Sequence, residues 1–345
     1  MRMSIPSFSL FLLLTACGGK HPGAYQGVNA AGATAGAEGV TSEADQLWAE
    51  RLDGEKLAQA LEKYEAVLES DPQNRTALER LTRGYYFYGD AFSQDKDTKI
   101  ERWGKAIEWG SRCLALNEDM AAKIAAGEKE KVAVEAATKA DVPCLYWMSS
   151  ALGKWGKSQS LSKTLKHLPT VKAYISKVEQ LEPAYNHYGP ARYWGAYYAA
   201  LPSFAGQDFD KSAEYFAASI EGSKVYLGTP VLRAEYLSAP LGDLATFNKD
   251  LAFVLNADAS KISPELVAEN TMEQEKAKRL LAKKGELFDK KTLAAEQPVP
   301  EVATEAPAAK EAATEAPAAD EAPAEEAASE APAEDSSEAT QPEKQ

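Results

Sequence analysis

Residues 153–158 read Gly-Lys-Trp-Gly-Lys-Ser and end in the Gly-Lys-Ser triplet that closes a phosphate-binding loop. In such a loop, backbone N–H groups and the lysine hold the phosphates of a nucleotide. The loop also needs a glycine five residues before Gly156, where this chain has Ala151, and a buried strand ahead of it. Residues 145–152 have instead the apolar spacing of a buried helix. We therefore do not expect nucleotide binding.

The other residue types that commonly carry catalysis form no recognisable pattern. The three histidines are His21, expected in a tether, His167, expected at a helix end, and His187, expected in a loop. They form no His-Glu-x-x-His or Cys/His cluster with metal-ligand spacing. The carboxylates alternate with Lys and Arg, as on a solvated helix face. The sequence predicts no catalytic residue, no metal site and no cofactor, so we do not expect an enzyme.

Cys17 is the residue with the clearest chemistry. Leu-Thr-Ala-Cys at residues 14–17 resembles the bacterial lipobox, in which the cysteine thiol takes a diacylglycerol and the cysteine becomes the new N-terminus. Arg2 and the apolar run at residues 8–14 precede it and are too short to span a bilayer. We predict a lipoprotein signal peptide over residues 1–16 and lipidation of Cys17. The alternative is an ordinary secretory signal that a cysteine follows by chance.

Lipidation at Cys17 would attach the protein to a membrane, because buried acyl methylenes contribute roughly 0.8 kcal/mol each. The rest of the chain would then face the oxidising periplasm. Gly18 follows the cysteine, and in well-studied Gram-negative sorting a residue other than Asp there favours the outer membrane. The predicted location is therefore the periplasmic side of the cell envelope, at the outer membrane.

The two remaining cysteines, Cys113 and Cys144, are an even pair in a compartment that permits oxidation. This pattern favours a disulfide, which would contribute about 3 to 4 kcal/mol in the chain-entropy model. The alternative is two separate buried thiols.

The two ends of the chain do not have the composition of a folded domain. Residues 17–44 are rich in Gly, Ala, Ser and Thr and predict a flexible tether. Residues 291–345 repeat Glu-Ala-Pro-Ala variants and predict a disordered acidic tail. Residues 296–345 carry a net charge of −12 of the −14 of the whole chain. The body at residues 45–290 is therefore nearly neutral, and we expect no nucleic-acid partner.

Apolar residues in the body recur at spacings of three and four, which predicts an all-α fold. Ala60, Tyr64 and Pro72 fit the Ala-x3-Phe…Pro element of a tetratricopeptide repeat. Partial matches recur at residues 78–85, 171–183 and 212–220. We predict an irregular array of helical hairpins, an α-solenoid of the tetratricopeptide type.

Two insertions interrupt the predicted array. About a dozen extra residues near 89–99 separate Tyr85 from a partner helix at residues 100–116. Residues 120–141 are rich in Ala, Glu and Lys and predict a solvated extra helix. Insertions of this kind usually map to one face of a repeat protein, and this is often the binding face. A surface segment without a function is an equal alternative.

Aromatic residues gather in three clusters, at 85–88, 146–155 and 185–198. They could pack helix pairs or line a concave wall, where phenol groups supply polar handles on an apolar surface. Packing is the more common role of such residues. The candidates for a ligand or pore wall are Tyr85, Tyr88, Trp147, Tyr188, Arg192, Tyr193 and Tyr197.

Four stretches together resemble a known family. They are residues 144–147, residues 181–195, residues 210–216 and the block at residues 266–288. In order and content they resemble the TatT family, lipoproteins with divergent tetratricopeptide repeats that are associated with tripartite ATP-independent periplasmic (TRAP) transporters. The likeness covers residues 45–288 and is strongest after Pro143. Pro183, Gly195, Phe216 and Asn270 are the structural residues of these motifs.

The resemblance implies a periplasmic helical protein that assembles as a trimer, pairs with a solute-binding protein and offers an apolar central channel to a ligand. Our leading hypothesis is a non-enzymatic lipoprotein that binds this partner, and an apolar organic solute, as an accessory to uptake. The main alternative is an envelope scaffold whose concave face binds peptides. An enzyme is a third class, which only a cluster of perturbed ionisable groups would support.

Overall fold

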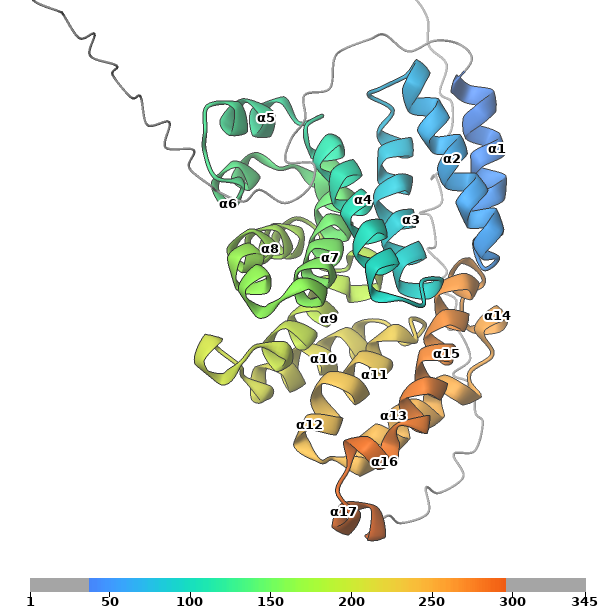
Figure 1. Cartoon of the computed structure of the whole chain (residues 1–345), viewed down its shortest axis with the longest axis vertical. Coiled ribbons are helices and arrows are strands. Elements are labelled where there is room, and N and C mark those ends of the chain that lie inside the picture. The colour runs from blue at the N-terminus through green and yellow to red at the C-terminus, as the bar shows by residue number, and fades with distance from the viewer. Residues whose placement is uncertain (1–36, 296–345) are drawn as a thin grey trace, which may run out of the picture. The chain divides into compact units, whose positions relative to one another are not determined.

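The structure is a computed structural model and describes residues 37–295 (Figure 1). Within this range all regular elements are helical and no strand occurs, which confirms the predicted all-α array. None of the helices in this range has both the length and the apolar composition needed to cross a membrane. The predicted signal peptide, Cys17, His21 and the tail from residue 296 lie outside the described residues.

The first half of the body is a series of helices in which neighbours pack together. The helices are α1 (Ala37–Ala49), α2 (Gly54–Ser70), α3 (Arg75–Ala91), α4 (Lys96–Leu114), α7 (Val142–Gln159) and α8 (Leu161–Leu181), coloured blue to green in Figure 1. Asp53 caps α2 by accepting hydrogen bonds from the backbone N–H groups of Glu55 and Lys56. Asp71 follows the last residue of α2, as the tetratricopeptide pattern predicts.

The second half begins with a further packed pair and ends in a small bundle. The pair is α9 (Tyr185–Ala200) and α10 (Phe209–Gly222). The bundle contains α11 (Gly228–Arg233), the π-helical turn η4 (Ala234–Ser238), α12 (Ala239–Leu241), α13 (Leu244–Asn256), α14 (Ala259–Ile262), α15 (Val267–Ala282), α16 (Lys284–Leu287) and α17 (Lys290–Ala294).

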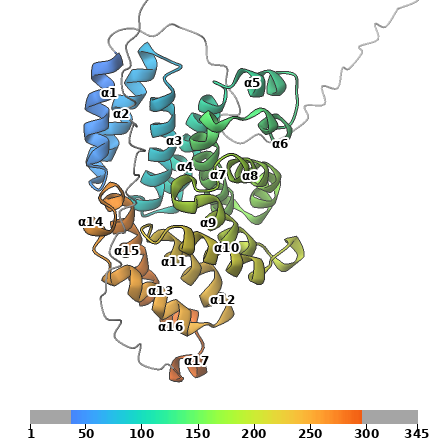
Figure 2. The ribbon, with the colours of Figure 1, turned by 180° about the vertical axis from the view of Figure 1, so that it is seen from behind.

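Two hydrophobic cores support these halves. The larger core runs through the hairpins from α1 to α9 and includes Tyr64, Ile107 and Tyr174. The smaller core, around Phe247 and Val254, joins α11, α13 and α15. Figure 2 shows the ribbon from behind, with α15 below the ends of the first hairpin. The last long helix of the chain therefore returns toward the first.

Helices extend beyond the predicted ends of the helical domain at both sides. Helix α1 begins at Ala37, inside the predicted tether at residues 17–44, and Ala44 and Trp48 are buried in the larger core. At the other end, α17 extends to Ala294, inside the predicted tail at residues 291–345. Apolar packing of Ala44 and Trp48 outweighs the small-residue composition that suggested a tether.

The predicted insertions also differ from the structure. Helix α3 continues through Gly89 to Ala91, and α4 begins at Lys96, so only a short turn joins them. Gly89 allows this because a Cβ atom there would lie 2.8 Å from the indole nitrogen of Trp103 on α4. Residues 120–141 form several short helices, and the buried side chains of Met120 and Val134 hold them on the core. This segment is therefore not a solvated helix.

A disulfide joins Cys113, near the end of α4, to Cys144, in the first turn of α7, with their Cα atoms 6.2 Å apart. This is the pair that the sequence predicted. The bond links two helices that are neighbours in the array but are separated in sequence by the short helices at residues 118–141.

The four family-motif residues have structural positions. Gly195 lets α9 approach α10, because a Cβ atom there would lie 2.7 Å from the ring of Phe216. Asn270 is fully buried, accepts a hydrogen bond from the Leu227 backbone N–H at 3.0 Å and donates one to a backbone carbonyl oxygen at 2.9 Å. Pro183 follows the end of α8. These residues fix the approach of α9, α10 and α15.

Candidate functional site

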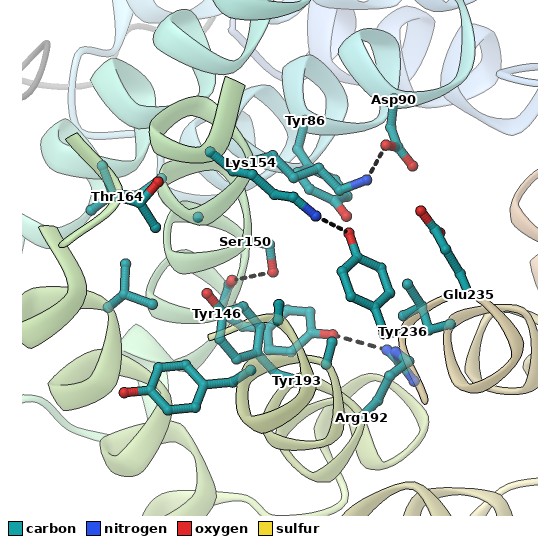
Figure 3. A pocket seen from close by; sticks show the side chains of 18 of the residues that line it. Tyr86, Asp90, Tyr146, Ser150, Lys154, Thr164, Arg192, Tyr193, Glu235 and Tyr236 are labelled. Carbon is teal, nitrogen blue, oxygen red and sulfur yellow. Dashed lines mark hydrogen bonds and ion pairs between the residues drawn. The ribbon is translucent and has the colours of Figure 1, made fainter. Parts of the chain in front are cut away.

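A cavity of about 600 Å³ lies among α3, α7, α8, α9, the segment from α11 to η4, and α15. Six tyrosines line it, and several of them are seen in Figure 3: Tyr86, Tyr146, Tyr193, Tyr197, Tyr226 and Tyr236. An aliphatic part of the wall consists of Leu161, Leu168, Val171, Val231 and Leu232. The lining thus combines apolar surface with many hydroxyl groups, as ligand sites commonly do.

Arg192 is a buried cation in this wall, with 3% of its surface exposed. Its guanidinium donates hydrogen bonds to the Tyr146 hydroxyl at 2.9 Å and to the backbone carbonyls of Asn186 and His187, each at 3.1 Å. The guanidinium carbon also lies 4.1 Å from the ring centroid of Tyr226. All of these partners are neutral.

The backbone that accepts from Arg192 has an unusual conformation. Three consecutive residues, Asn186, His187 and Tyr188, have left-handed backbone angles with φ of 49°, 57° and 56°. Residues with side chains pay of order 1 kcal/mol or more each for this region. The turn points two carbonyl oxygens at one guanidinium, so Arg192 and the turn stabilise each other.

Asp90 forms the second charged group of the cavity. Its carboxylate accepts hydrogen bonds from Lys154 on α7 and Lys276 on α15, and Lys276 also contacts Glu273 at 2.7 Å. Burial alone would raise the pKa of Asp90, but the two ammonium groups hold it well below its usual range. Burial alone would lower the pKa of Lys276, yet Asp90 and Glu273 raise it well above the usual value. Asp90 and Lys276 are therefore both charged at neutral pH, and the cluster connects α3, α7 and α15.

Three of the tyrosines in the cavity wall keep their protons at neutral pH. Burial raises the pKa of Tyr86, Tyr193 and Tyr226 well above the usual value for a phenol. Their hydroxyl groups therefore remain hydrogen-bond donors over the whole physiological pH range. His187, the middle residue of the left-handed turn, has a lowered pKa because of burial and the nearby Arg192.

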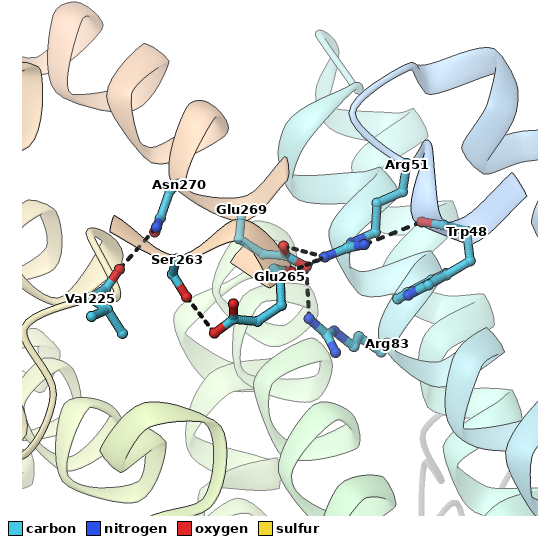
Figure 4. A network of polar contacts seen from close by, with 8 residues as sticks. All are labelled: Trp48, Arg51, Arg83, Val225, Ser263, Glu265, Glu269 and Asn270. Carbon is cyan, nitrogen blue, oxygen red and sulfur yellow. Dashed lines mark hydrogen bonds and ion pairs between the residues drawn. The ribbon is translucent and has the colours of Figure 1, made fainter. Parts of the chain in front are cut away.

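A second polar cluster positions the helix that carries Lys276. Glu269 on α15 binds the guanidinium of Arg51 with both oxygens, at 3.0 and 2.7 Å, and accepts a hydrogen bond from Arg83 at 2.7 Å (Figure 4). Arg51 follows α1 and Arg83 lies on α3. Burial would raise the pKa of Glu269, but Arg83 and Arg51 lower it. The cluster attaches α15 to the first hairpins.

The structure places four of the seven predicted wall residues at the cavity: Trp147, Arg192, Tyr193 and Tyr197. The other three do not line this cavity and make contacts elsewhere. Tyr85 donates a hydrogen bond to Glu65 at 2.7 Å, away from the cavity. Tyr88 stacks under the guanidinium of Arg102, and Tyr188 packs over Gly222 with 36% of its surface exposed.

Other residues of the cavity wall were not predicted from the sequence. Tyr86 and Tyr146 belong to the predicted aromatic clusters, but helical spacing alone did not show which cluster members share a face with the cavity. Asp90, Glu273 and Lys276 have no sequence signal, because their partners come from distant helices. His167 lies within α8 and is buried in the cavity wall, not at a helix end as predicted.

The segment at residues 153–158 lies on the cavity wall but is not a phosphate-binding loop. It is part of the continuous helix α7, whose backbone N–H groups are used within the helix. Gly153 has a packing role, since a Cβ atom there would lie 2.8 Å from the hydroxyl of Tyr193. Lys154 and Lys157 project into the cavity lining.

Three possible metal-ligand atoms meet in the described part of the chain, from Glu79, Cys113 and Cys144. The two sulfur atoms are joined in the disulfide and are not available as thiolate ligands. We therefore do not assign a metal site to this group.

With the fold and the cavity in place, the chain can be compared with known proteins. The family model described as TRAP transporter T-component matches residues 51–288. This range covers the helical body from Arg51 to Phe288 and includes every residue named in the cavity wall. A comparison with curated proteins finds no match.

Proposed function

Because this chain belongs to the TRAP transporter T-component family, we propose that it is an accessory component of TRAP-type uptake whose cavity receives an organic solute. Membership in the family implies association with the transport system at the cell envelope. The cavity of about 600 Å³ carries the solute-binding part of the proposal, because its size and mixed lining suit a small organic molecule. The proposed role is not catalytic.

The remaining parts of the proposal concern placement and partners. Lipidation of Cys17 would hold the protein at the membrane, on the periplasmic face of the outer membrane. A periplasmic solute-binding protein is the proposed partner, and a homotrimer is the proposed assembly. The resemblance to the TatT family in the motifs at residues 181–195 and 266–288 supports both.

The lining modifies the expected chemistry of the ligand. The family resemblance implies an apolar channel, and the cavity wall of this chain has cations, carboxylates and tyrosine hydroxyls beside its aliphatic part. The occupant should therefore have both an apolar body and polar groups. A peptide-binding envelope scaffold would need an extended open groove, and it is retained as an outcome of the test.

The experiment uses the full chain in its native host, with chemical crosslinking in intact cells followed by purification and mass spectrometry. We expect a solute-binding protein among the crosslinked products and a reproducible small-molecule adduct in native mass spectra. Ala196→Trp, which fills the cavity, should remove the adduct. Ala217→Trp, at an exposed position on α10, is the matched control and should keep it.

A bare monomer without an adduct and without a solute-binding protein would contradict the proposal. Recovery of envelope-assembly proteins instead would favour the scaffold. An adduct that survives Ala196→Trp but not a change elsewhere would place the solute outside this cavity.

A further inference from the structure

The cavity lining contains more cationic than anionic side chains. Six cationic residues line it, namely Lys99, Lys154, Lys157, Arg192, Lys276 and Arg279. Three carboxylic acids line it, namely Asp90, Glu235 and Glu273. An excess of positive charge in a partly enclosed, low-dielectric space raises the local concentration of anions.

The excess charge is not spread evenly. Asp90 and Glu273 are engaged with Lys154 and Lys276, so this group is close to neutral. Arg192 has no carboxylate within ion-pair distance among residues 37–295, and its partners are the neutral oxygens described above. A buried cation that is solvated only by dipoles leaves a field that a ligand anion can neutralise.

A buried donor without an acceptor and an exposed ammonium group accompany Arg192 in the cavity lining. The Nδ2 atom of Asn186, in the cavity wall, is buried and has no hydrogen-bond partner in the described part of the protein. A buried amide N–H without an acceptor is unfavourable, and a ligand oxygen that accepts from it would remove that cost. Lys157, at the exposed side of the cavity, donates only to the Tyr236 hydroxyl, at 3.0 Å.

From these observations we infer that the cavity binds an amphipathic organic anion, with its negative group toward Arg192, Asn186 and Lys157 and its apolar body on the aliphatic wall. This inference rests on the proposed function, since it names the chemical class of the solute. Leu161, Leu168 and Val171 on α8 supply the aliphatic surface, and the cavity tyrosines supply donors along it. Arg192 acts through its charge, because its N–H groups already have acceptors.

The test measures binding to the chain from Gly18 to Gln345 by calorimetry at pH 7. The probes are alkanoates of eight, ten and twelve carbons and the primary alcohols of the same lengths. We expect each carboxylate to bind about tenfold more tightly than its alcohol, a difference typical of one charge-assisted contact. Added salt should weaken binding of the carboxylates and leave the alcohols unchanged.

Variants then locate the charge. Lys157→Gln and Arg279→Gln should each weaken decanoate binding about fivefold, as expected for loss of one nearby charge near the surface, and leave decanol binding unchanged. Lys278→Gln is the control, because Lys278 adjoins Arg279 on α15 but pairs with Glu275 outside the cavity. Thermal unfolding of each variant checks that the fold is retained.

Equal or tighter binding of the alcohols, or no binding of either series, would overturn the inference. If the alcohols bind as tightly as the carboxylates or more tightly, and the solute-binding protein is still crosslinked in cells, the anion assignment fails and the proposed function stands. If neither series binds and no partner is recovered, both fail.

Discussion

Arg192 lies among neutral acceptors, whereas Asp90 lies between two ammonium groups, and both are largely buried. Charges removed from water are costly unless paired or well solvated by dipoles. At Asp90 the cost is met within the protein, by Lys154 and Lys276. At Arg192 the charge is solvated by two backbone carbonyl groups of a left-handed turn, and the backbone conformation of that turn is itself unfavourable. The first arrangement stabilises the fold, and the second leaves a net charge for a ligand.

Asp90→Asn tests the first arrangement. The pKa of Asp90 in the folded state is lowered from its usual 3.8, so its stabilising contribution is present above that value and is lost as pH falls through the folded value. The free energy of unfolding of the variant at pH 7 should be about 2 kcal/mol lower. The loss is smaller than for a fully buried ion pair, because the two lysines are partly exposed to solvent. Urea unfolding between pH 2 and 7 should show a flatter acid dependence than the natural chain.

The control for Asp90→Asn is Asp97→Asn, at an exposed position in the first turn of α4. It should leave both the stability at pH 7 and the acid dependence nearly unchanged. An equal acid dependence in Asp90→Asn and the natural chain would show that Asp90 is not held ionised by its neighbours.

At the scale of the elements, helix pairs approach closely where one helix has a glycine and the other a large side chain. Gly195 of α9 faces Phe216 of α10, and Gly110 of α4 faces Met148 of α7. These contacts let the hairpins stack at short distance, as small residues do in tetratricopeptide repeats. The same close approach brings α7 and α9 to the two sides of the cavity.

Gly195→Ala should destabilise the protein by about 1–3 kcal/mol, because its Cβ atom would overlap the Phe216 ring at 2.7 Å in a packed core. Chemical denaturation measures this change. Gly104→Ala on α4 is the matched control, since a Cβ atom there would lie 3.8 Å from its nearest neighbour. It should be neutral or stabilise by up to about 1 kcal/mol through helix propensity. Equal effects of the two changes would contradict close packing at Gly195.

The disulfide between α4 and α7 makes a further prediction at this scale. Replacing Cys113 and Cys144 together by Ser should lower the free energy of unfolding by about 3 to 4 kcal/mol, mainly because the unfolded chain gains freedom. Denaturation of the natural chain with and without a reductant provides the comparison. A double variant as stable as the oxidised natural chain would show that the crosslink adds nothing.

At the scale of the whole molecule, polar contacts join the larger core to the smaller one. Glu269 binds Arg51 and Arg83, and Asp90 binds Lys276, so ion pairs attach α15 to α3 and to the residue that follows α1 by two positions. The cavity lies beside these attachments. Its shape therefore depends on how firmly the C-terminal bundle is held.

Glu269→Gln should lower stability by about 3 kcal/mol, because it leaves two guanidinium groups without their carboxylate in a largely buried site. We expect calorimetry to show two thermal transitions in the variant, the earlier one from the bundle around Phe247. Glu275→Gln, at an exposed position on the same helix, is the control. A single transition in Glu269→Gln at the natural temperature would contradict this coupling.

Local patterns were sufficient to predict much of the fold. The capped helix between Asp53 and Asp71, the buried face of α8 at Val171 and Ile175, and the all-α class follow from spacing and end signals, which depend on neighbours in sequence. Helices extend beyond the predicted boundaries at 45 and 290, and a short turn stands where an insertion was predicted near Gly89. At those positions, contacts with distant side chains such as Tyr64 and Trp103 decide what is helical.

The sequence by itself determined the helical class and the family to which the chain belongs, because both follow from residue types at short spacings. It favoured a bond between Cys113 and Cys144, and the structure decided between that bond and two separate thiols. Only the tertiary structure decided that Tyr193 and Tyr197 line the cavity while Tyr85 and Tyr88 do not. It alone brought Asp90, Lys154 and Lys276 together. The physical reason is that a cavity and a buried ion cluster are formed by helices far apart in the chain, and helical periodicity gives the buried face of each helix without its distant partner.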